Sequence, residues 1–366
     1  MTKDILQSPV KFHCGVEFKN RMVLAPMTNG QSHPDGRISD AEVRWLAMRA
    51  EGGFGALVSA ASHVQKDALS FAGQLGCFSD DQVAGLAAAE RTCKAAGAPI
   101  VLQIYHGGLR VPRALTGVQP TAPSSVQLDF PGFETPRELT DAEIESIAAN
   151  FVAAAMRAKS AGMVGVEIHG ANGYLFTQFL SSITNKRKDR WGGNLEGRAR
   201  LIVETARHIR AAAGPSFLIG ARLLPEDAPN QRGFDVEEML TASNWLADAG
   251  IDYLHLSSGN VRAKPWLEPD KGVSTIRRFR DGLPKRVKLI ACGGIKSLDD
   301  ATYAIAQGAD LIALGKAAIL EPAWPRDALA PGHTPASWPV TEARLAELGV
   351  SGAFVTYLRK FNKLVM

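Results

Sequence analysis

The sequence lacks the cysteine pattern of a metal or disulfide site. Its four cysteines are widely spaced and none belongs to a Cys-x-x-Cys pair: Cys14, Cys77, Cys93 and Cys292. Zinc sites, iron–sulfur clusters and disulfide frameworks need closely or regularly spaced cysteines. We therefore expect reduced thiols and no metal site.

Long apolar runs and strongly basic stretches are also missing. No apolar run approaches the roughly 20 residues that span a bilayer, and the first residues, MTKDILQSPVKF, show no apolar core followed by a cleavage site. The formal net charge is only +4, and Lys and Arg are scattered along the chain. These absences predict a cytoplasmic protein that binds neither a membrane nor nucleic acid.

What the sequence does contain is an alternation of short apolar segments with longer amphipathic ones. With 366 residues, 46% of them hydrophobic, the chain is long enough for one large domain or two ordinary ones. Eight apolar segments, each followed by a helical pattern, predict an α/β fold, the parallel (β/α)8 TIM barrel, with an open doubly wound sheet as the alternative. The strand candidates are Met22–Ala25, Ala56–Ser59, Ile100–Tyr105, Val164–Ile168, Phe217–Arg222, Tyr253–Ser257, Val287–Ala291 and Leu311–Leu314.

Signals for helix starts support this count. A Ser or Thr followed three residues later by Glu, Gln or Asp satisfies backbone N–H groups at a helix start. Such pairs, with two further cap candidates, are Ser39 and Glu42, Ser79 and Gln82, Thr140 and Glu143, Ser297 and Asp300, Asp235, and Asn194.

The predicted organisation is a single domain over residues 1–366, with the barrel over about 20–330 and a C-terminal helical tail over 331–366. An N-terminal cap, to about Lys19, is either a hairpin or a lid. Long loops follow the third and fourth strands, over Gly107–Leu139 and Gly170–Gly193. Both leave carboxyl ends of strands, where barrel enzymes place their chemistry, so we expect them to cover an active site. The tail should pack on the barrel or on a neighbouring subunit through Phe354, Tyr357, Leu358, Phe361 and Leu364.

Polar side chains stand near the carboxyl ends of several predicted strands. Ala25-Pro26-Met27-Thr28 closes the first, Gln103 and Tyr105 lie in the third, and Arg222 ends the fifth. Because these ends share one rim of a barrel, we expect the side chains to converge. Gln103 could instead be a satisfied core amide, and Arg222 could pair with Glu226 or Asp227.

The fourth strand carries the densest cluster. His169 ends it, and Asn172 and Tyr174 follow across Gly170 and Gly173, which let the backbone turn. The last two strands end in glycines and a cation that suit a phosphate: Gly293-Gly294 and Gly315-Lys316.

These segments resemble the Old Yellow Enzyme family, the FMN-dependent ene-reductases grouped with NADH:flavin oxidoreductases. The resemblance runs from about Val10 to Pro325 and is most specific in VEIHGANGYL (166–175) and NKRKDRWGG (185–193). The other matching pieces are Asn20-Arg21, APMT (25–28), LQIYHGG (102–108), QFL (178–180), Gly293-Gly294 and Gly315-Lys316.

The resemblance implies tightly bound, non-covalent FMN with NAD(P)H as the electron donor. The implied FMN contacts are Ala25, Pro26, Met27, Thr28, Ala61, Gln103, His169, Arg222, Gly293, Gly294, Gly315 and Lys316, with Thr28 at the ring's carbonyl edge, Gln103 at the pyrimidine end and Arg222 near N1 and O2. The implied substrate contacts are His169, Asn172, Tyr105 and Thr28. His169 and Asn172 would grip the substrate oxygen, and Tyr174 would donate a proton.

Several positions depart from the family pattern. Lys316 stands where Arg is common, which changes a bidentate phosphate contact into a point-charge one. Trp191 replaces a frequent Tyr, Tyr105 stands where Trp is frequent, and Thr28 replaces the Cys of one branch.

The implied activity is reduction of the C=C bond of α,β-unsaturated carbonyl compounds, with hydride from flavin N5 and a proton from Tyr174. Alternatives are another FMN barrel oxidoreductase, a non-catalytic flavin- or phenol-binding barrel, and a phosphate-binding aldolase barrel. The expected partners are a nicotinamide cofactor and a small enone-type substrate, in a monomer or a homo-oligomer.

Overall fold

Eight parallel strands form a closed ring in the computed structural model, which describes residues 2–128, 132–227, 232–266, 272–361 and 363–366. The strands pair in the order β4-β3-β13-β12-β11-β10-β9-β6, and a further pairing of β4 with β6 closes the ring. They are β3 (Met22–Leu24), β4 (Ala56–Val58), β6 (Ile100–Tyr105), β9 (Gly165–Gly170), β10 (Leu218–Leu223), β11 (Tyr253–Ser257), β12 (Lys288–Cys292) and β13 (Leu311–Leu314). The predicted (β/α)8 barrel is confirmed, and the open sheet is wrong.

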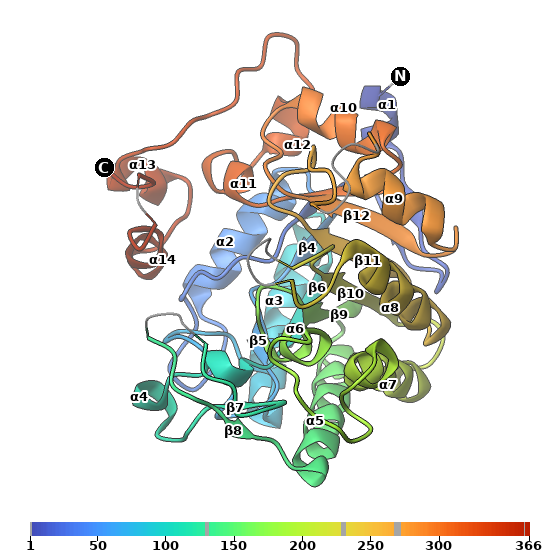
Figure 1. Ribbon diagram of the computed structural model, residues 1–366. Coiled ribbons are helices and arrows are strands. Elements are labelled where there is room, and N and C mark those ends of the chain that lie inside the picture. The colour runs from blue at the N-terminus through green and yellow to red at the C-terminus, as the bar shows by residue number, and fades with distance from the viewer. Residues whose placement is uncertain (1, 129–131, 228–231, 267–271, 362) are drawn as a thin grey trace.

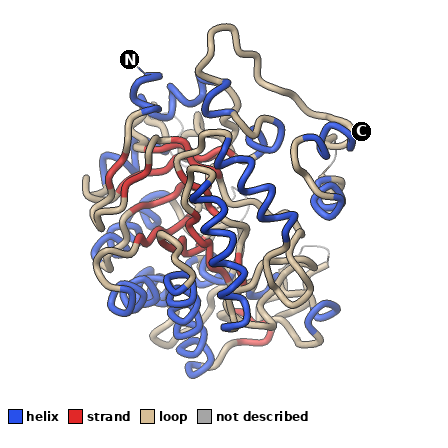
Figure 2. The backbone as a smooth tube through the Cα atoms, turned by 180° about the vertical axis from the view of Figure 1, so that it is seen from behind, coloured by secondary structure: helices blue, strands red, loops and turns tan. Residues whose placement is uncertain are grey.

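Helices surround the strands on the outside of the ring, as Figures 1 and 2 show from opposite sides. They are α2 (Asp40–Glu51), α3 (Val83–Ala95), α5 (Asp141–Ser160), α7 (Leu195–Ala213), α8 (Val236–Asp248), α9 (Thr275–Gly282), α10 (Leu298–Ala306) and α11 (Lys316–Leu320). The predicted caps at Ser39, Thr140, Asn194, Asp235 and Ser297 all accept backbone N–H groups. Ser79 caps a short 3-10 helix, η1 (Asp80–Gln82), which leads into α3.

The N-terminal segment closes the end of the barrel opposite the loops. It consists of α1 (Thr2–Gln7) and an antiparallel hairpin of β1 (Val10–Lys11) and β2 (Glu17–Phe18). Phe12 and Phe18 pack with Val23 and Leu311, which lie in the amino halves of their strands or at their starts. The lid alternative is therefore wrong, because these apolar side chains are buried under the barrel rather than over its active face.

The two long connections after β6 and β9 carry short elements of their own. They are η2 (Gly108–Arg110), α4 (Arg113–Thr116), β7 (Thr121–Ala122) and β8 (Arg137–Glu138) in the first, and α6 (Leu175–Leu180) in the second. A further short strand, β5 (Ser62–His63), pairs with the end of β6.

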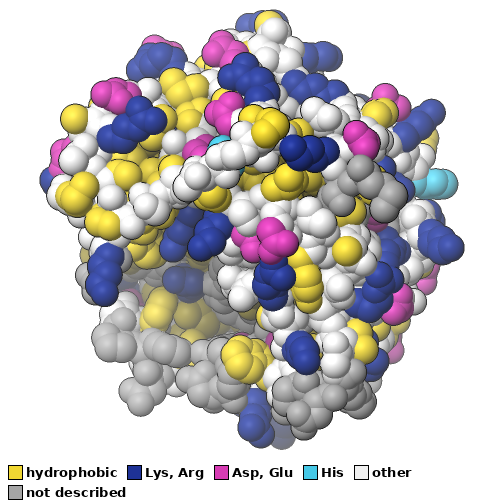
Figure 3. All heavy atoms as spheres, turned by 90° about the horizontal axis from the view of Figure 1, so that it is seen from above, with side chains coloured by type: hydrophobic (Ala, Val, Ile, Leu, Met, Phe, Trp, Pro, Cys, Tyr) yellow, Lys and Arg dark blue, Asp and Glu magenta, His cyan; other side chains and the backbone are white. Residues whose placement is uncertain are grey.

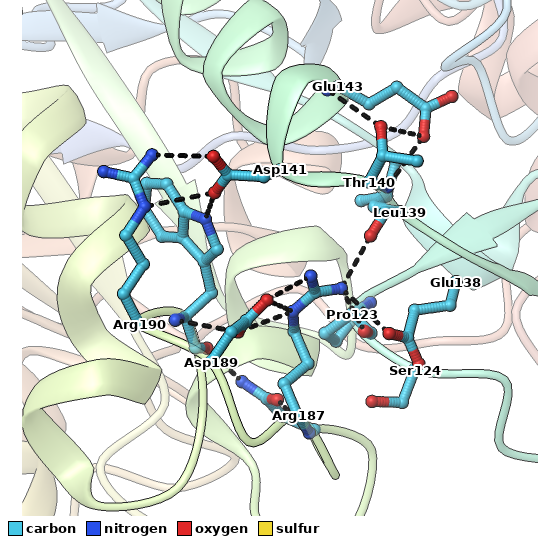
Figure 4. Close-up of polar contacts among 12 residues, drawn as sticks. Pro123, Ser124, Glu138, Leu139, Thr140, Asp141, Glu143, Arg187, Asp189 and Arg190 are labelled. Atoms are coloured by element: carbon cyan, nitrogen blue, oxygen red, sulfur yellow. Dashed lines mark hydrogen bonds and ion pairs between the residues drawn. The ribbon is translucent and has the colours of Figure 1, made fainter.

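Figure 4 shows how the two connections are joined. The nearly buried guanidinium of Arg187 donates to the carbonyls of Pro123 at 3.0 Å and Leu139 at 2.6 Å, and it pairs with Asp189. The indole N–H of Trp191 donates to Asp141, in the first turn of α5. These contacts give Trp191 a structural role that the sequence did not explain.

The tail packs on the barrel, as one of the two predicted arrangements requires. After α12 (Trp324–Asp327) a long connection leads to α13 (Glu342–Glu347) and α14 (Gly352–Leu358) (Figure 1). The ring of Phe354 lies 5.6 Å from that of Trp45 in α2. The predicted helical spacing extends to Leu364, but the helix itself ends at Leu358.

The surface shows no single-sign stripe on the face in Figure 3, where Lys and Arg are interspersed with Asp and Glu. Among the helices of the described residues, none is long and apolar enough to cross a membrane.

Candidate active site

A cavity of about 270 Å³ lies at the carboxyl ends of the barrel strands. Most of the side chains predicted for the site line it: Pro26, Met27, Thr28, Ala61, Gln103, His169, Asn172, Tyr174, Arg222 and Lys316. The opposite wall comes from α11 and the tail, through Ile319, Phe354, Tyr357, Leu358, Phe361 and Leu364. Residues from both ends of the chain thus enclose one space.

His169 is a neutral hydrogen-bond donor in this cavity. Its ring is 3% exposed, and burial, reinforced by the nearby positive charge of Arg222, lowers the pKa of His169 to about 3. The ring Nδ1 accepts the backbone N–H of Ala171 at 3.4 Å. The proton of the neutral imidazole is therefore on Nε2, where it can be donated to a ligand.

Asn172 and Tyr174 stand beside this histidine. Asn172 adopts the left-handed conformation with φ 60°, which Asn tolerates better than most residues. Its side-chain oxygen accepts the hydroxyl of Ser257 at 3.5 Å, so that its amide nitrogen remains to donate. The ring of Tyr174 meets that of His169 edge-on at 5.1 Å. Burial raises the pKa of Tyr174 while Arg110 opposes the rise, so the phenol is protonated at neutral pH.

Tyr105 lies behind these residues rather than on the cavity surface. It is fully buried, and its hydroxyl donates to Ser70. Its ring meets that of Tyr174 edge-on at 4.6 Å. Tyr105 therefore supports the position of Tyr174, and a direct contact between Tyr105 and substrate stays a prediction.

Arg222 brings a buried positive charge to the cavity. Its side chain is 9% exposed, and its buried Nε has no hydrogen-bond partner. The carboxylate of Glu226, one of the two acids considered for an ion pair, accepts the backbone N–H of Trp266 at 3.0 Å. The other, Asp227, accepts the backbone N–H of Gly233 at 3.0 Å. An orphaned, buried guanidinium nitrogen facing a cavity is a ready donor for an acceptor on a ligand.

The predicted phosphate residues lie at the ends of β12 and β13. Gly293 has φ 131°, and a Cβ there would lie 2.1 Å from the carbonyl oxygen of Ser258. Gly294 has φ 67°, and Gly315 lies beside the side chain of Met27. Only glycine fits at Gly293, so this turn presents backbone N–H groups rather than a side chain. Lys316 is exposed and starts α11.

At two predicted flavin contacts, Ala25 and Ala61, backbone groups bond within the protein. Ala25 is buried at the end of β3, and its N–H donates to Leu314 in β13. The carbonyl of Ala61 accepts the side-chain amide of Gln74 at 3.0 Å.

A larger cavity of about 1230 Å³ adjoins the first and shares Asn172 with it. Its wall includes Arg110 and Phe133 from the loop after β6, and Ser257, Lys264 and Trp266 from β11 and the loop after it. A ligand in the first cavity therefore has space to extend beyond it.

The sequence did not single out two contributors to the site. Arg110 lies 4.9 Å above the ring of Tyr174 and donates to the carbonyl of Asn172. Tyr357 of α14 lines the same cavity as Thr28. The helical spacing of the tail indicated an apolar face, but nothing in the sequence indicated what that face covers.

The residues present fit FMN. A flavin ring offers carbonyl acceptors and a negative charge on reduction, which suit the unpartnered Nε of Arg222 and the amide of Gln103. The glycine turn at Gly293 and the cation of Lys316 suit its phosphate. In the described part of the chain, no group of three or more His, Cys, Asp or Glu side chains could hold a metal ion.

Comparisons with known proteins agree with this chemistry. The family model for the NADH:flavin oxidoreductase / NADH oxidase family matches residues 6–330. The chain is 37% identical over 323 residues to the probable NADH-dependent flavin oxidoreductase YqiG of Bacillus subtilis, covering 87% of this chain and 86% of that protein. It is 36% identical over 328 residues to an NADH:fumarate oxidoreductase of Klebsiella pneumoniae, covering 87% of this chain but 35% of that protein.

A solved structure supports the same assignment. The old yellow enzyme homologue from Zymomonas mobilis matches with a TM-score of 0.77 at 28% identity, over 88% of this chain and 91% of that one. The chain therefore belongs to the NADH:flavin oxidoreductase / NADH oxidase family and is an FMN-dependent NAD(P)H oxidoreductase of the Old Yellow Enzyme type.

Proposed function

We propose that this protein reduces the activated C=C bond of α,β-unsaturated carbonyl compounds. The observation that carries the proposal is the placement of three hydrogen-bond donors, from His169, Asn172 and Tyr174, on one cavity that also presents Arg222 and Gln103. FMN, when bound, would supply the hydride chemistry, with NAD(P)H as the electron donor.

His169 and Asn172 bind the carbonyl oxygen of the substrate in this proposal. The Nε2–H of the neutral imidazole and the amide of Asn172 both donate to that oxygen. Negative charge grows on the oxygen as hydride reaches the β carbon. The two hydrogen bonds therefore strengthen toward the transition state, which is the condition for catalysis.

Tyr174 supplies the proton to the α carbon. Its hydroxyl is protonated because burial raises its pKa. Arg110, 4.9 Å above the ring, stabilises the phenolate that remains after proton transfer. Arg222 lines the same cavity as His169, and its positive charge would favour a reduced, anionic flavin.

A relative supports the substrate class. The name of the NADH:fumarate oxidoreductase specifies a substrate whose C=C bond is conjugated to carboxyl groups. The cavity here has its donors at one side and apolar tail residues at the other, which suits a molecule with one polar carbonyl end.

Anaerobic spectroscopy of the holoenzyme tests the proposal. NADPH or NADH should bleach the flavin absorbance, and 2-cyclohexenone should then restore it. Bleaching without restoration would favour a flavin protein that acts on other acceptors, and a purified protein that binds no FMN would contradict the site. The double variant His169→Ala/Asn172→Ala should still be bleached but should lose the long-wavelength absorbance produced by a bound phenol.

A further inference from the structure

A polar cluster is buried inside the barrel and includes a side chain that lines the cavity. Its centre is Glu167 of β9, whose carboxylate is 0% exposed. Glu167 lies in the middle of the segment Val166-Glu167-Ile168, between two fully buried apolar residues. None of the roles proposed above uses this carboxylate, and an ionised group in such a place needs a reason.

Three donors converge on Glu167. The side-chain amide nitrogen of Gln103 donates to Oε1 at 2.7 Å, the hydroxyl of Tyr253 donates to Oε2 at 3.1 Å, and Nδ1 of His255 lies 2.9 Å from Oε2. Burial raises the pKa of Glu167, but the combined effect of His255 and Arg222 in lowering it is larger. The net shift is downward, so the group is a carboxylate.

Neighbouring strands are shaped to hold this cluster. Gln103 of β6 is the register partner of Glu167, which places the two side chains next to each other. At Gly220 of β10 an added Cβ would lie 2.0 Å from the ring of Tyr253. The glycine therefore makes room for the ring to reach the carboxylate over the intervening strand β10.

A carboxylate can only accept hydrogen bonds, so it fixes which end of the neighbouring amide faces it. The NH2 group of Gln103 must face Glu167, and the carbonyl Oε1 must face away from it. Gln103 also lines the cavity. Gln103 therefore presents a defined pattern to a ligand in the cavity. Its carbonyl oxygen is an acceptor, and the second N–H of its amide is a donor beside it.

We infer that Glu167 is a positioning residue, which orients the amide of Gln103 to read the imide edge of the flavin pyrimidine ring. That edge is an N–H next to a carbonyl, and it matches an acceptor next to a donor. A flipped amide would set acceptor against acceptor and donor against donor. This inference rests on the proposed assignment of Gln103 to the FMN site.

A double-mutant cycle tests whether Glu167 acts through Gln103. FMN release from the holoenzyme on dilution, followed by flavin fluorescence, gives the dissociation constant. Glu167→Gln keeps the shape but lets the Gln103 amide take either orientation, and it should weaken FMN binding about tenfold, the equivalent of about 1.4 kcal/mol. In the Gln103→Ala background the same change should weaken binding less than about twofold.

A matched control separates positioning from general stability. Glu90 is also a buried carboxylate, which accepts the backbone N–H of Ile100 at 2.7 Å at the opposite, amino end of β6. Glu90→Gln should lower the melting temperature of the holoenzyme while leaving FMN affinity unchanged. Should Glu167→Gln not fold, Glu167→Asp keeps the charge but withdraws it from Gln103, and the same non-additivity is expected.

The outcomes distinguish the positioning role of Glu167 from the assignment of the FMN site. Additive losses from Glu167→Gln and Gln103→Ala, or full FMN affinity in Glu167→Gln, would overturn the positioning role alone. Full FMN affinity in Gln103→Ala and also in Arg222→Ala would overturn the proposed FMN site itself.

Discussion

At the scale of single residues, the site depends on groups that burial keeps neutral. Tyr174 and His169 both lie in surroundings that disfavour their charged forms. The protonated phenol of Tyr174 can donate a proton, and the neutral imidazole of His169 can donate a hydrogen bond from Nε2. The proposed carbonyl activation and proton transfer require these two donors.

Replacing Tyr174 by Phe should separate the two halves of the reaction. The variant keeps the ring that packs on Tyr105 and His169 but lacks the proton. Reduction of 2-cyclohexenone should slow by about 100-fold or more, since general acids commonly contribute that much. Reduction of the flavin by NADPH should change little. Stopped-flow measurement of each half-reaction provides the check, and equal slowing of both would remove Tyr174 from the role of proton donor.

The low pKa of His169 predicts ligand binding that does not vary with pH. The ordinary pKa of His is about 6.5, and burial lowers that of His169 to about 3. Its ring therefore stays neutral from pH 5 to 8, and the affinity for p-cresol, which ionises only at high pH, should be constant over that range. A break near pH 6.5 that disappears in His169→Asn would contradict this.

The same shift has a consequence for stability. Between about pH 3 and 6.5 the unfolded chain binds a proton at His169 that the folded chain does not. This residue therefore makes the protein less stable as the pH falls through that window. His169→Asn should reduce the slope of melting temperature against pH there, whereas an unchanged slope would show that the histidine titrates alike in both states.

At the scale of helices and strands, local signals predicted most of the barrel. The strands at Ile100–Tyr105, Tyr253–Ser257 and Leu311–Leu314 have the predicted bounds, because apolar runs between turn residues define a buried strand. The fourth strand extends to Gly170, which pairs with Leu223 of β10, and such pairing is invisible in one segment read alone.

The loop contacts and the polar cluster around Glu167 could not be predicted from single segments either, because their partners come from other parts of the chain. The pairing of β7 with β8 lies within one loop, but Arg187, which donates to carbonyls beside both strands, comes from a distant segment of the chain. Glu167 lies within an apolar strand, where its charge requires buried partners. That Tyr253 and His255 would be among them follows only from the closed ring.

Arg187 should hold the loop after β6 in place. Arg187→Ala removes donors from the carbonyls of Pro123 and Leu139 and should destabilise the protein by about 2–4 kcal/mol. The loop should also open more often, so trypsin should cut after Arg113 faster than in the wild type, as peptide mass spectrometry would show. Arg187→Lys is the control, since it keeps the charge but cannot bridge both carbonyls and Asp189. Cleavage of Arg187→Lys at the wild-type rate would show that charge alone holds the loop.

At the scale of the whole molecule, the two ends of the chain meet across the site. Thr28, which follows the first barrel strand, and Tyr357, in the last helix, line the same cavity. Arg49 of α2 is fully buried and donates to the carbonyls of Ala318 in α11 and Leu348 in the tail. Through these contacts the tail is fixed to the same elements that begin the site, and it acts as a wall of the cavity.

That wall should set the size of substrate that the cavity accepts. Tyr357 lines the cavity, so Tyr357→Ala enlarges it, whereas Tyr357→Phe removes only the hydroxyl. Because one pocket contact commonly discriminates by about tenfold or more, kcat/KM for a bulky cyclic enone should rise by about that factor relative to 2-cyclohexenone in Tyr357→Ala. The ratio should stay near the wild-type value in Tyr357→Phe. An unchanged ratio in Tyr357→Ala, with an unchanged melting temperature, would mean that substrate does not reach the tail and that the loop after β6 alone bounds it.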